Sequence, residues 1–167
     1  MSEQSLVKAS LNLPCSVVIL SAAAEGRKDA LTATVMYVSQ VSPMVVVSIS
    51  KASNTYQLIE KSKEFAINVI ADNQLELASK LGHIHGFDLD KFQEFGVAIE
   101  SATKIGAPII SGCFANLECQ AKTALWEVEG DHAIYVAEVV AFKLNENLKP
   151  MVWLNKQYFQ IGAQCQI

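Results

Sequence analysis

The chain has 167 residues, of which 51% are hydrophobic and 18% are charged, and its formal net charge is −4. This length is typical of one domain with its own core, so residues 1–167 are predicted to form a single domain. No apolar run approaches the roughly 18 residues of a membrane span, and the lack of any Lys/Arg block argues against a nucleic-acid partner.

The first half of the chain predicts strands with one short helix. Apolar, β-branched and aromatic composition predicts strands at 14–22, 30–38, 44–50 and 65–70, with a turn at 25–29 and a break at Ser42-Pro43. Between the last two strands, Asn54 is predicted to cap a helix that begins at Thr55. Gln57 stands at the spacing of a capping box.

The second half predicts another helix and a β-hairpin. Residues 72–82 have helical apolar spacing, with Asp72 or Asn73 as the N-cap and Gly82 as the stop. Residues 83–96 predict a loop with one helical turn at 90–95. Strands are predicted at 113–120 and 133–142, with the reversal at 127–132. Because no βαβ rhythm is present, these elements favour a mainly β antiparallel barrel with short helices on its flank.

The apolar content also predicts how the chain associates. A mean hydropathy of +0.25 is high for a soluble monomer, so a subunit interface is expected, and a homodimer is the commonest assembly. Residues 1–10 lack the basic and apolar regions of a secretory signal, which predicts a cytoplasmic protein.

The cysteines and histidines show no metal-binding pattern. The four cysteines, Cys15, Cys113, Cys119 and Cys165, include no CxxC pair or zinc-like cluster and are predicted to be reduced thiols. Cys113 and Cys119 are predicted to face the core from one strand. His83 and His85 form an H-x-H pair, but no further cluster of ligands lies nearby in the sequence. No metal site is therefore predicted.

Hydroxyl side chains collect where the strand at 44–50 meets the first helix. Side chains alternate along this strand, so Val45, Val47 and Ile49 face the core, while Met44, Val46, Ser48 and Ser50 lie on the opposite face. The next polar residues are Lys51, Ser53, Asn54 and Thr55. A helix N-terminus offers unpaired N–H groups and a positive dipole end, so the set predicts a phosphate site. The alternative is an ordinary cap and turn.

Two threonines on the preceding strand add a second polar patch. Thr32 and Thr34 share one face of an otherwise apolar strand. If this strand lies near Ser48, the patch has the donors to bind the edge of a flat polar heterocycle whose phosphate reaches residues 50–55. Threonine is also an ordinary strand former, which is the simpler interpretation.

These segments resemble the flavin reductase-like FMN-binding split-barrel proteins. The resemblance rests on "LTATVMYVSQVSPMVVVSISKASNTYQLIEKSKEFAINVI", "QLELASKLG", "DKF", "APIISGCFANLECQ" and "GDHAIYVAEV", which follow the order of that family over most of the chain. It implies a homodimer of mainly β, six-stranded antiparallel Greek-key split barrels with short flanking helices, each binding FMN near the subunit interface. Ala30-Leu31 departs from the Gly-Met that the family often has at this place.

The resemblance also implies residue roles. Thr32 to Thr34 would contact the pyrimidine side of the flavin ring, and the helix start would hold the phosphate. The complete expected cofactor-binding set is Thr32, Ala33, Thr34, Ser48, Ile49, Ser50, Lys51, Ser53, Asn54 and Thr55. His132 of "GDH" would face the nicotinamide dinucleotide, its alternative being a solvated loop residue. His85 and Phe87 are expected to border the pocket.

The implied activity is hydride transfer from NAD(P)H to FMN, with electrons passing to free flavin, a monooxygenase, a metal complex or oxygen. Flavin chemistry of this kind needs position and electrostatics from the protein and no acid or base side chain. The alternatives are a flavoredoxin-like FMN electron carrier, or a split barrel that binds haem or a pyridoxal-type phosphate or serves only for dimerisation. The choice between NADH and NADPH and the final acceptor stay open.

Overall fold

The computed structural model describes residues 9, 11–39, 41–84, 89–125, 130–163 and 165. The strands of this part of the chain are β1 Cys15–Ser16, β2 Val18–Ala24, β3 Arg27–Ala33, β4 Val35–Tyr37, β5 Met44–Ser50, β6 Glu64–Val69, β7 Ile99–Glu100, β8 Ile109–Ile110, β9 Ala115–Leu125, β10 His132–Leu144, β11 Met151–Leu154 and β12 Gln157–Gln160. The helices are α2 Asn54–Ser62, α3 Leu75–His83, α4 Lys91–Glu94 and the 3-10 turn η1 Asp72–Gln74.

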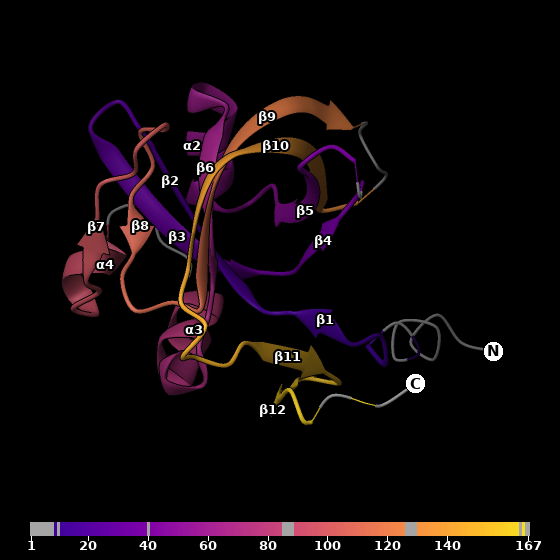
Figure 1. The fold of residues 1–167 in the computed structure, drawn as a ribbon. Coiled ribbons are helices and arrows are strands. Elements are labelled where there is room, and N and C mark those ends of the chain that lie inside the picture. The colour runs from indigo at the N-terminus through magenta and orange to yellow at the C-terminus, as the bar shows by residue number, and fades with distance from the viewer. Residues whose placement is uncertain are drawn as a thin grey trace.

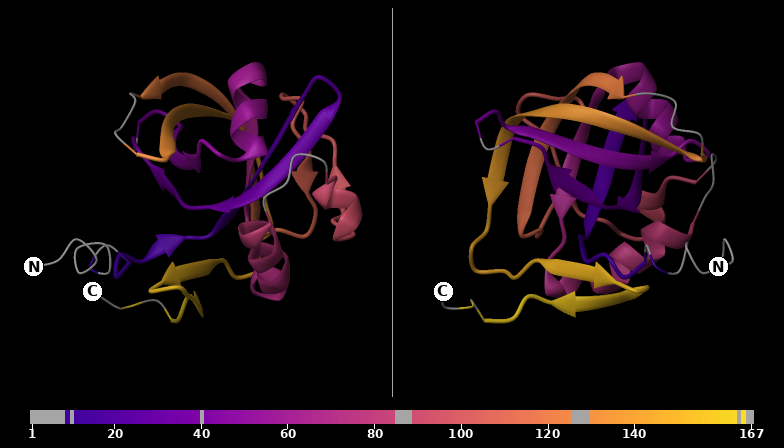
Figure 2. Two further views of the ribbon diagram at one scale, coloured as in Figure 1. Left: turned by 180° about the vertical axis from the view of Figure 1, so that it is seen from behind. Right: turned by 90° about the vertical axis from the view of Figure 1, so that its right-hand side faces the viewer.

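The main sheet is antiparallel and curls on itself. Its strand order is β3-β2-β6-β9-β10-β5-β4, and every neighbouring pair is antiparallel. The two edge strands, β3 and β4, are consecutive in the chain and separated only by Thr34. The chain therefore carries one edge of the sheet into the other, which gives the barrel shape seen in Figures 1 and 2. This confirms the predicted mainly β antiparallel fold, with seven strands in the sheet instead of six.

A second layer lies below the barrel in Figure 1. It contains the three-stranded sheet β1-β11-β12 and the helix α3, while β7 and β8 pair separately at the side of the barrel. Strands β11 and β12 were not predicted from the sequence. Their chain reversal is only two residues long, Asn155 and Lys156, whose φ angles are 48° and 63°.

The alternation predicted for β5 is confirmed by burial. Val45, Val47 and Ile49 are 7%, 1% and 0% exposed, while Ser48 is exposed on the other face. The buried side chains belong to the barrel core, together with residues such as Phe65. A second core cluster lies between the sheet and the helices α3 and α4. The cleft described below opens where this second layer faces the barrel.

Two predicted boundaries were wrong. Gly82 lies inside α3, one residue before its end, and it lacks the positive φ angle of a helix stop. The turn expected at 25–29 is limited to Glu25 and Gly26, with φ angles of 51° and 73°. The polar residues that follow belong to β3 because they pair with the small residues of β2, Ala22 facing Asp29.

The described helices are short. α2 and α3 have nine residues each, and none of the described helices is long and apolar enough to span a bilayer.

The cysteines are free thiols in the structure. Cys113 and Cys119 are both buried, as predicted, but Cys113 precedes β9 instead of lying on it. Burial raises the pKa of Cys113 to about 11 and that of Cys119 to about 12. Both therefore stay protonated and unreactive at neutral pH.

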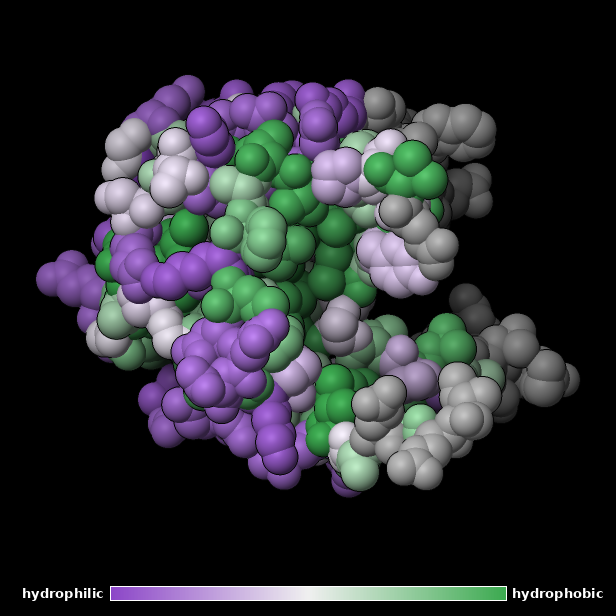
Figure 3. All heavy atoms as spheres, viewed as in Figure 1, coloured by the Kyte–Doolittle hydropathy of each residue, from purple (hydrophilic) through white to green (hydrophobic). Residues whose placement is uncertain are grey.

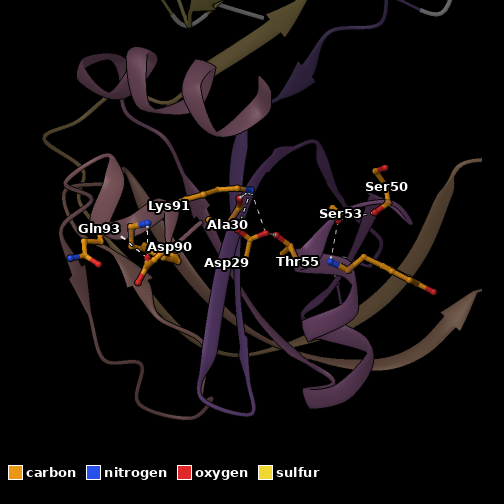
Figure 4. Close-up of polar contacts among 10 residues, drawn as sticks. Asp29, Ala30, Ser50, Ser53, Thr55, Asp90, Lys91 and Gln93 are labelled. Carbon is orange, nitrogen blue, oxygen red and sulfur yellow. Dashed lines mark hydrogen bonds and ion pairs between the residues drawn. The ribbon is translucent and has the colours of Figure 1, made fainter. Parts of the chain in front are cut away.

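A buried ion pair joins the barrel to two helices. Asp29 on β3 is 0% exposed and Lys91 on α4 is 3% exposed, with 3.0 Å between the Lys91 Nζ and the Asp29 Oδ1. Lys91 also donates to the Ala30 carbonyl at 2.8 Å, and the Thr55 hydroxyl of α2 donates to the Asp29 Oδ2 at 2.7 Å. Figure 4 shows Asp29 between these two partners. One carboxylate thus fixes the starts of two helices against one strand.

We expect Lys91→Ala to lower the free energy of unfolding by about 3–5 kcal/mol, because it leaves a buried carboxylate without its cation. Urea denaturation followed by circular dichroism measures this loss. Lys122→Ala is the control, because the Lys122 ammonium pairs with Glu138 at the surface, where a pair contributes about 0–1 kcal/mol. Equal losses in the two variants would contradict the role of Asp29. If Lys91→Ala does not fold, Thr55→Val provides a milder test, with an expected loss of about 1–3 kcal/mol.

Candidate functional site

A cleft of about 720 Å³ opens between the barrel and the second layer. Figure 3 shows a notch in the surface with β4 above it and β1 below it in the matching view of Figure 1, where a neighbouring cavity of about 320 Å³ shares Thr34 and Ser48 with this cleft. The walls come from the end of β3, the end of β5, the end of α3 and the β11–β12 hairpin. The lining residues are Val17, Leu31, Thr32, Ala33, Thr34, Ser48, Ser50, Ser53, Leu81, Gly82, His83, His132, Trp153, Lys156 and Tyr158.

The cleft brings together most of the residues that the sequence singled out. Those that line it are Thr32, Ala33, Thr34, Ser48, Ser50, Ser53 and His132. Four members of the expected set do not line it: Ile49, Lys51, Asn54 and Thr55. His85 and Phe87 lie outside the described residues, as does Trp126.

Strand pairing explains why the polar side chains converge. β5 pairs with β10 in a register that places Ser50 opposite His132, so the ends of these strands lie side by side. Alternation along β5 turns Ser48 and Ser50 toward the outer face. Thr34 stands at the bend between β3 and β4, and β4 pairs with β5. The closure of the barrel therefore brings Thr34 close to the serine face.

The hydroxyls of the cleft fall into two groups. Thr32 donates to the Ala78 carbonyl of α3 at 2.6 Å, and Ser53 donates to the Ser50 carbonyl at 2.8 Å. Both are committed to the fold. In the described part of the chain, no hydrogen bond to another residue occupies the hydroxyls of Thr34, Ser48 and Ser50. These three can bind a polar ligand without breaking a protein contact.

The start of α2 differs from the sequence prediction. The N-cap is Ser53, whose hydroxyl accepts from the Tyr56 N–H at 3.1 Å, and the helix begins at Asn54. The predicted Asn54 cap was wrong by one residue, because the Ser53 hydroxyl is held in place by the Ser50 carbonyl (Figure 4). Thr55 faces the buried Asp29 instead of the cleft. What α2 offers to a ligand is therefore the backbone of its first turn and the positive end of its dipole.

Lys51 and Ile49 also differ from the expected contacts. The Lys51 ammonium donates to the Gly130 carbonyl at 3.3 Å, which draws it toward the β9–β10 connection. The Ile49 side chain is 0% exposed in the barrel core. Only the backbone of Ile49 is therefore available on the cleft side of β5.

Two histidines border the cleft. The Nδ1 atom of His132 lies 2.8 Å from the Asp131 carboxylate, and this hydrogen bond is the main cause that lowers the pKa of Asp131. The Nδ1 atom of His83 lies 2.7 Å from the Ser79 carbonyl, which only accepts, so Nδ1 carries the proton. Among the described residues no group of three or more His, Cys, Asp or Glu side chains is placed to hold a metal ion.

The sequence missed the lower wall of the cleft. Trp153, Lys156 and Tyr158 come from the β11–β12 hairpin, which was not predicted. The available signal was a short apolar or aromatic run on each side of an Asn-Lys pair, since asparagine favours the positive φ angles of a two-residue turn. Trp153 and Tyr158 also pack against the second core cluster, so this aromatic wall of the cleft is held in place by the core.

Comparisons with known proteins agree on the family. A family model described as "Flavin reductase like domain" matches residues 10–162. The FMN reductase (NADH) RutF of Pantoea ananatis is 22% identical over 163 residues, which cover 97% of this chain and 83% of RutF. The reductase subunit HsaB of a flavin-dependent monooxygenase from Rhodococcus jostii is 26% identical, over 70% of this chain and 55% of HsaB.

A solved structure shares the fold. The NADH:FAD oxidoreductase SgcE6 of Streptomyces globisporus has a TM-score of 0.86 and 22% identity, over 97% of this chain and 95% of SgcE6. The chain spans between 55% and 64% of the length of four of its curated relatives, HsaB among them.

We expect Ser53→Ala to lower the free energy of unfolding by about 1 kcal/mol, because it removes the N-cap of α2. Ser50→Ala is the matched control, since its hydroxyl has no partner in the described part of the chain, and we expect a change within about 0.5 kcal/mol. Parallel urea titrations measure both. A larger loss for Ser50→Ala than for Ser53→Ala would reverse the assignment of the two hydroxyls.

Proposed function

Because the chain belongs to the family of flavin reductase-like domains, we propose that it is an oxidoreductase that uses FMN and takes hydride from NAD(P)H. The observation that carries this proposal is the cleft itself. Three hydroxyls that make no hydrogen bond to another described residue, those of Thr34, Ser48 and Ser50, line it next to the start of α2. This is the arrangement that a flat polar ring with a phosphate tail requires.

The size and the lining of the cleft support a flavin mononucleotide as the ligand. Its volume of about 720 Å³ lies within the usual range of roughly 300–1,000 Å³ for small-molecule sites. Leu31, Trp153 and Tyr158 provide apolar and aromatic surface for the ring. The backbone N–H groups at the start of α2, beside Ser50, provide the phosphate site. We propose FMN because RutF, which matches 97% of this chain, is named as an FMN reductase, although SgcE6 is named for FAD.

When bound, the flavin supplies the hydride-accepting chemistry, and the residues of the cleft supply position and electrostatics. Thr34 and Ser48 stand where they can donate to the polar edge of the ring and stabilise negative charge there. Thr32 acts through α3, because its hydroxyl holds the Ala78 carbonyl. His132 lines the cleft at the end of β10 and contacts the dinucleotide. Its hydrogen bond to Asp131 orients the ring.

A protein partner and a second subunit belong to this proposal. HsaB is named as the reductase subunit of a monooxygenase, which supports a monooxygenase or another redox protein as the acceptor. Met36, Tyr37 and Val41, on and after β4, are 63%, 66% and 95% exposed, which supports an interface there in a homodimer. Sedimentation velocity distinguishes this dimer from a monomer. The cytoplasmic location stays a prediction of the sequence.

The decisive experiment is anaerobic addition of NADH or NADPH to the protein with FMN. We expect the flavin absorbance to bleach, and steady-state oxidation of the dinucleotide to accelerate with excess free FMN, with FAD and riboflavin as comparison flavins. A flavoredoxin-like carrier would bleach slowly and gain nothing from free flavin. Absence of binding to every one of these flavins would refute the proposal.

We expect His132→Ala to raise the KM for the dinucleotide about tenfold, a loss of roughly 1.4 kcal/mol, while kcat and the Kd for FMN stay unchanged. This is the pattern of lost ground-state binding. Steady-state kinetics and a fluorescence titration with FMN measure the three constants, with Lys122→Ala as a control outside the cleft. A weaker affinity for FMN would show that His132 contacts the flavin instead.

A further inference from the structure

The cleft has charge of only one sign. Among its described lining residues, the basic side chains are Lys156, His83 and His132, and no carboxylate lines it. Most other described lysines are neutralised by ion pairs, at Lys28, Lys61, Lys63, Lys80, Lys91, Lys122 and Lys143. In the described part of the chain no ion pair or hydrogen bond involves the Lys156 ammonium. This cation is therefore available to an anionic ligand.

The backbone of Lys156 is held at a defined place on the cleft wall. Asn155 and Lys156 form the two-residue turn between Leu154 and Gln157, both with positive φ angles, which non-glycine residues rarely adopt. The Asn155 N–H donates to the Leu11 carbonyl at 2.8 Å, which anchors the turn to the segment before β1. Because Trp153 and Tyr158 on either side pack into the second core cluster, the hairpin is fixed on the barrel.

The proposed phosphate site lies on a different wall. Ser50 and Ser53 come from the end of β5 and the start of α2, on the barrel side, whereas Lys156 comes from the second layer (Figure 1). A third part of the wall is the C-terminal end of α3 at Gly82 and His83. That end carries the negative pole of the helix dipole and disfavours a phosphate. A second anionic group in the cleft is therefore best placed at Lys156.

From this geometry we infer that Lys156 binds the phosphate groups of the nicotinamide dinucleotide and is a specificity-determining residue. The inference rests on the proposed function, in which the first phosphate site is occupied by FMN. A dinucleotide brings a pyrophosphate, and NADPH adds a 2′-phosphate. The one arginine of the chain, Arg27, lines a separate cavity of about 690 Å³ at the β2–β3 turn, so it is not in the cleft to bind either group.

The test compares Lys156→Ala and Lys156→Gln with Lys149→Ala, an exposed lysine outside the cleft. We expect the KM for NADH to rise about five- to tenfold in both Lys156 variants, because each variant loses one charge-assisted contact. The KM of these variants should also depend less on the salt concentration. In both Lys156 variants kcat and the Kd for FMN stay within about twofold of the wild-type values. Lys149→Ala has the wild-type KM, kcat and Kd.

Calorimetric titration with ADP-ribose and with 2′-phospho-ADP-ribose provides a readout that needs no turnover. A Lys156→Ala loss of affinity that is equal for the two ligands assigns Lys156 to the pyrophosphate. A larger loss for 2′-phospho-ADP-ribose assigns it to the 2′-phosphate and predicts a preference for NADPH. Both outcomes support the inference, even if NADH oxidation itself were not found.

Two results would overturn the inference. One is unchanged affinity for both ADP-ribose ligands in the Lys156 variants, together with an unchanged KM. The other is a loss of affinity confined to FAD, which would place the second phosphate of that flavin at Lys156. If the protein binds the ADP-ribose ligands through Lys156 but binds no flavin, the proposed function fails while the phosphate site stands.

Discussion

The buried contact of Asp29 with Lys91 and Thr55 holds the framework on which the cleft depends. A fully buried carboxylate is stable only if cations and donors satisfy it, and here they come from α4 and from the first turn of α2. The contact thereby fixes α2 against β3, the strand that runs on to Thr34. The hydroxyl-bearing wall on β3 and the wall at the start of α2 are thus both attached to this anchor.

The bend at Thr34 serves the barrel and the site together. β3 and β4 are opposite edges of one curled sheet, and the chain passes between them at this single residue. The Thr34 hydroxyl makes no hydrogen bond to another described residue, so it is available to a ligand. The neighbouring hydroxyls differ in the same way: the Thr32 hydroxyl attaches α3, whereas no other described residue hydrogen-bonds to the hydroxyls of Ser48 and Ser50 on the outer face of β5.

Relatives at 22–26% identity share the family or the fold, and they are named for different flavins and different systems. The barrel core and its closure account for what they share. RutF is named for FMN and SgcE6 for FAD. Residues that line the cleft but carry no structural contact can change without cost to the fold, so a difference in flavin can be accommodated there. In this chain Lys156 is a position of this kind, on a hairpin whose flanking aromatic residues hold it in place.

The sequence by itself determined the longer strands of the main sheet, their antiparallel character, the inward face of β5 and the region of the candidate ligand site. These depend on alternation, composition and turn residues, which act over a few neighbouring positions. Only the tertiary structure decided which hydroxyls are available. Thr32 is paired with a carbonyl 46 positions away and Thr55 with a carboxylate 26 positions away. It also added the β11–β12 wall, because a short hairpin becomes a site only when another layer packs against it. Which distant residues contact one another depends on how the layers pack together, and a local sequence pattern does not contain this information.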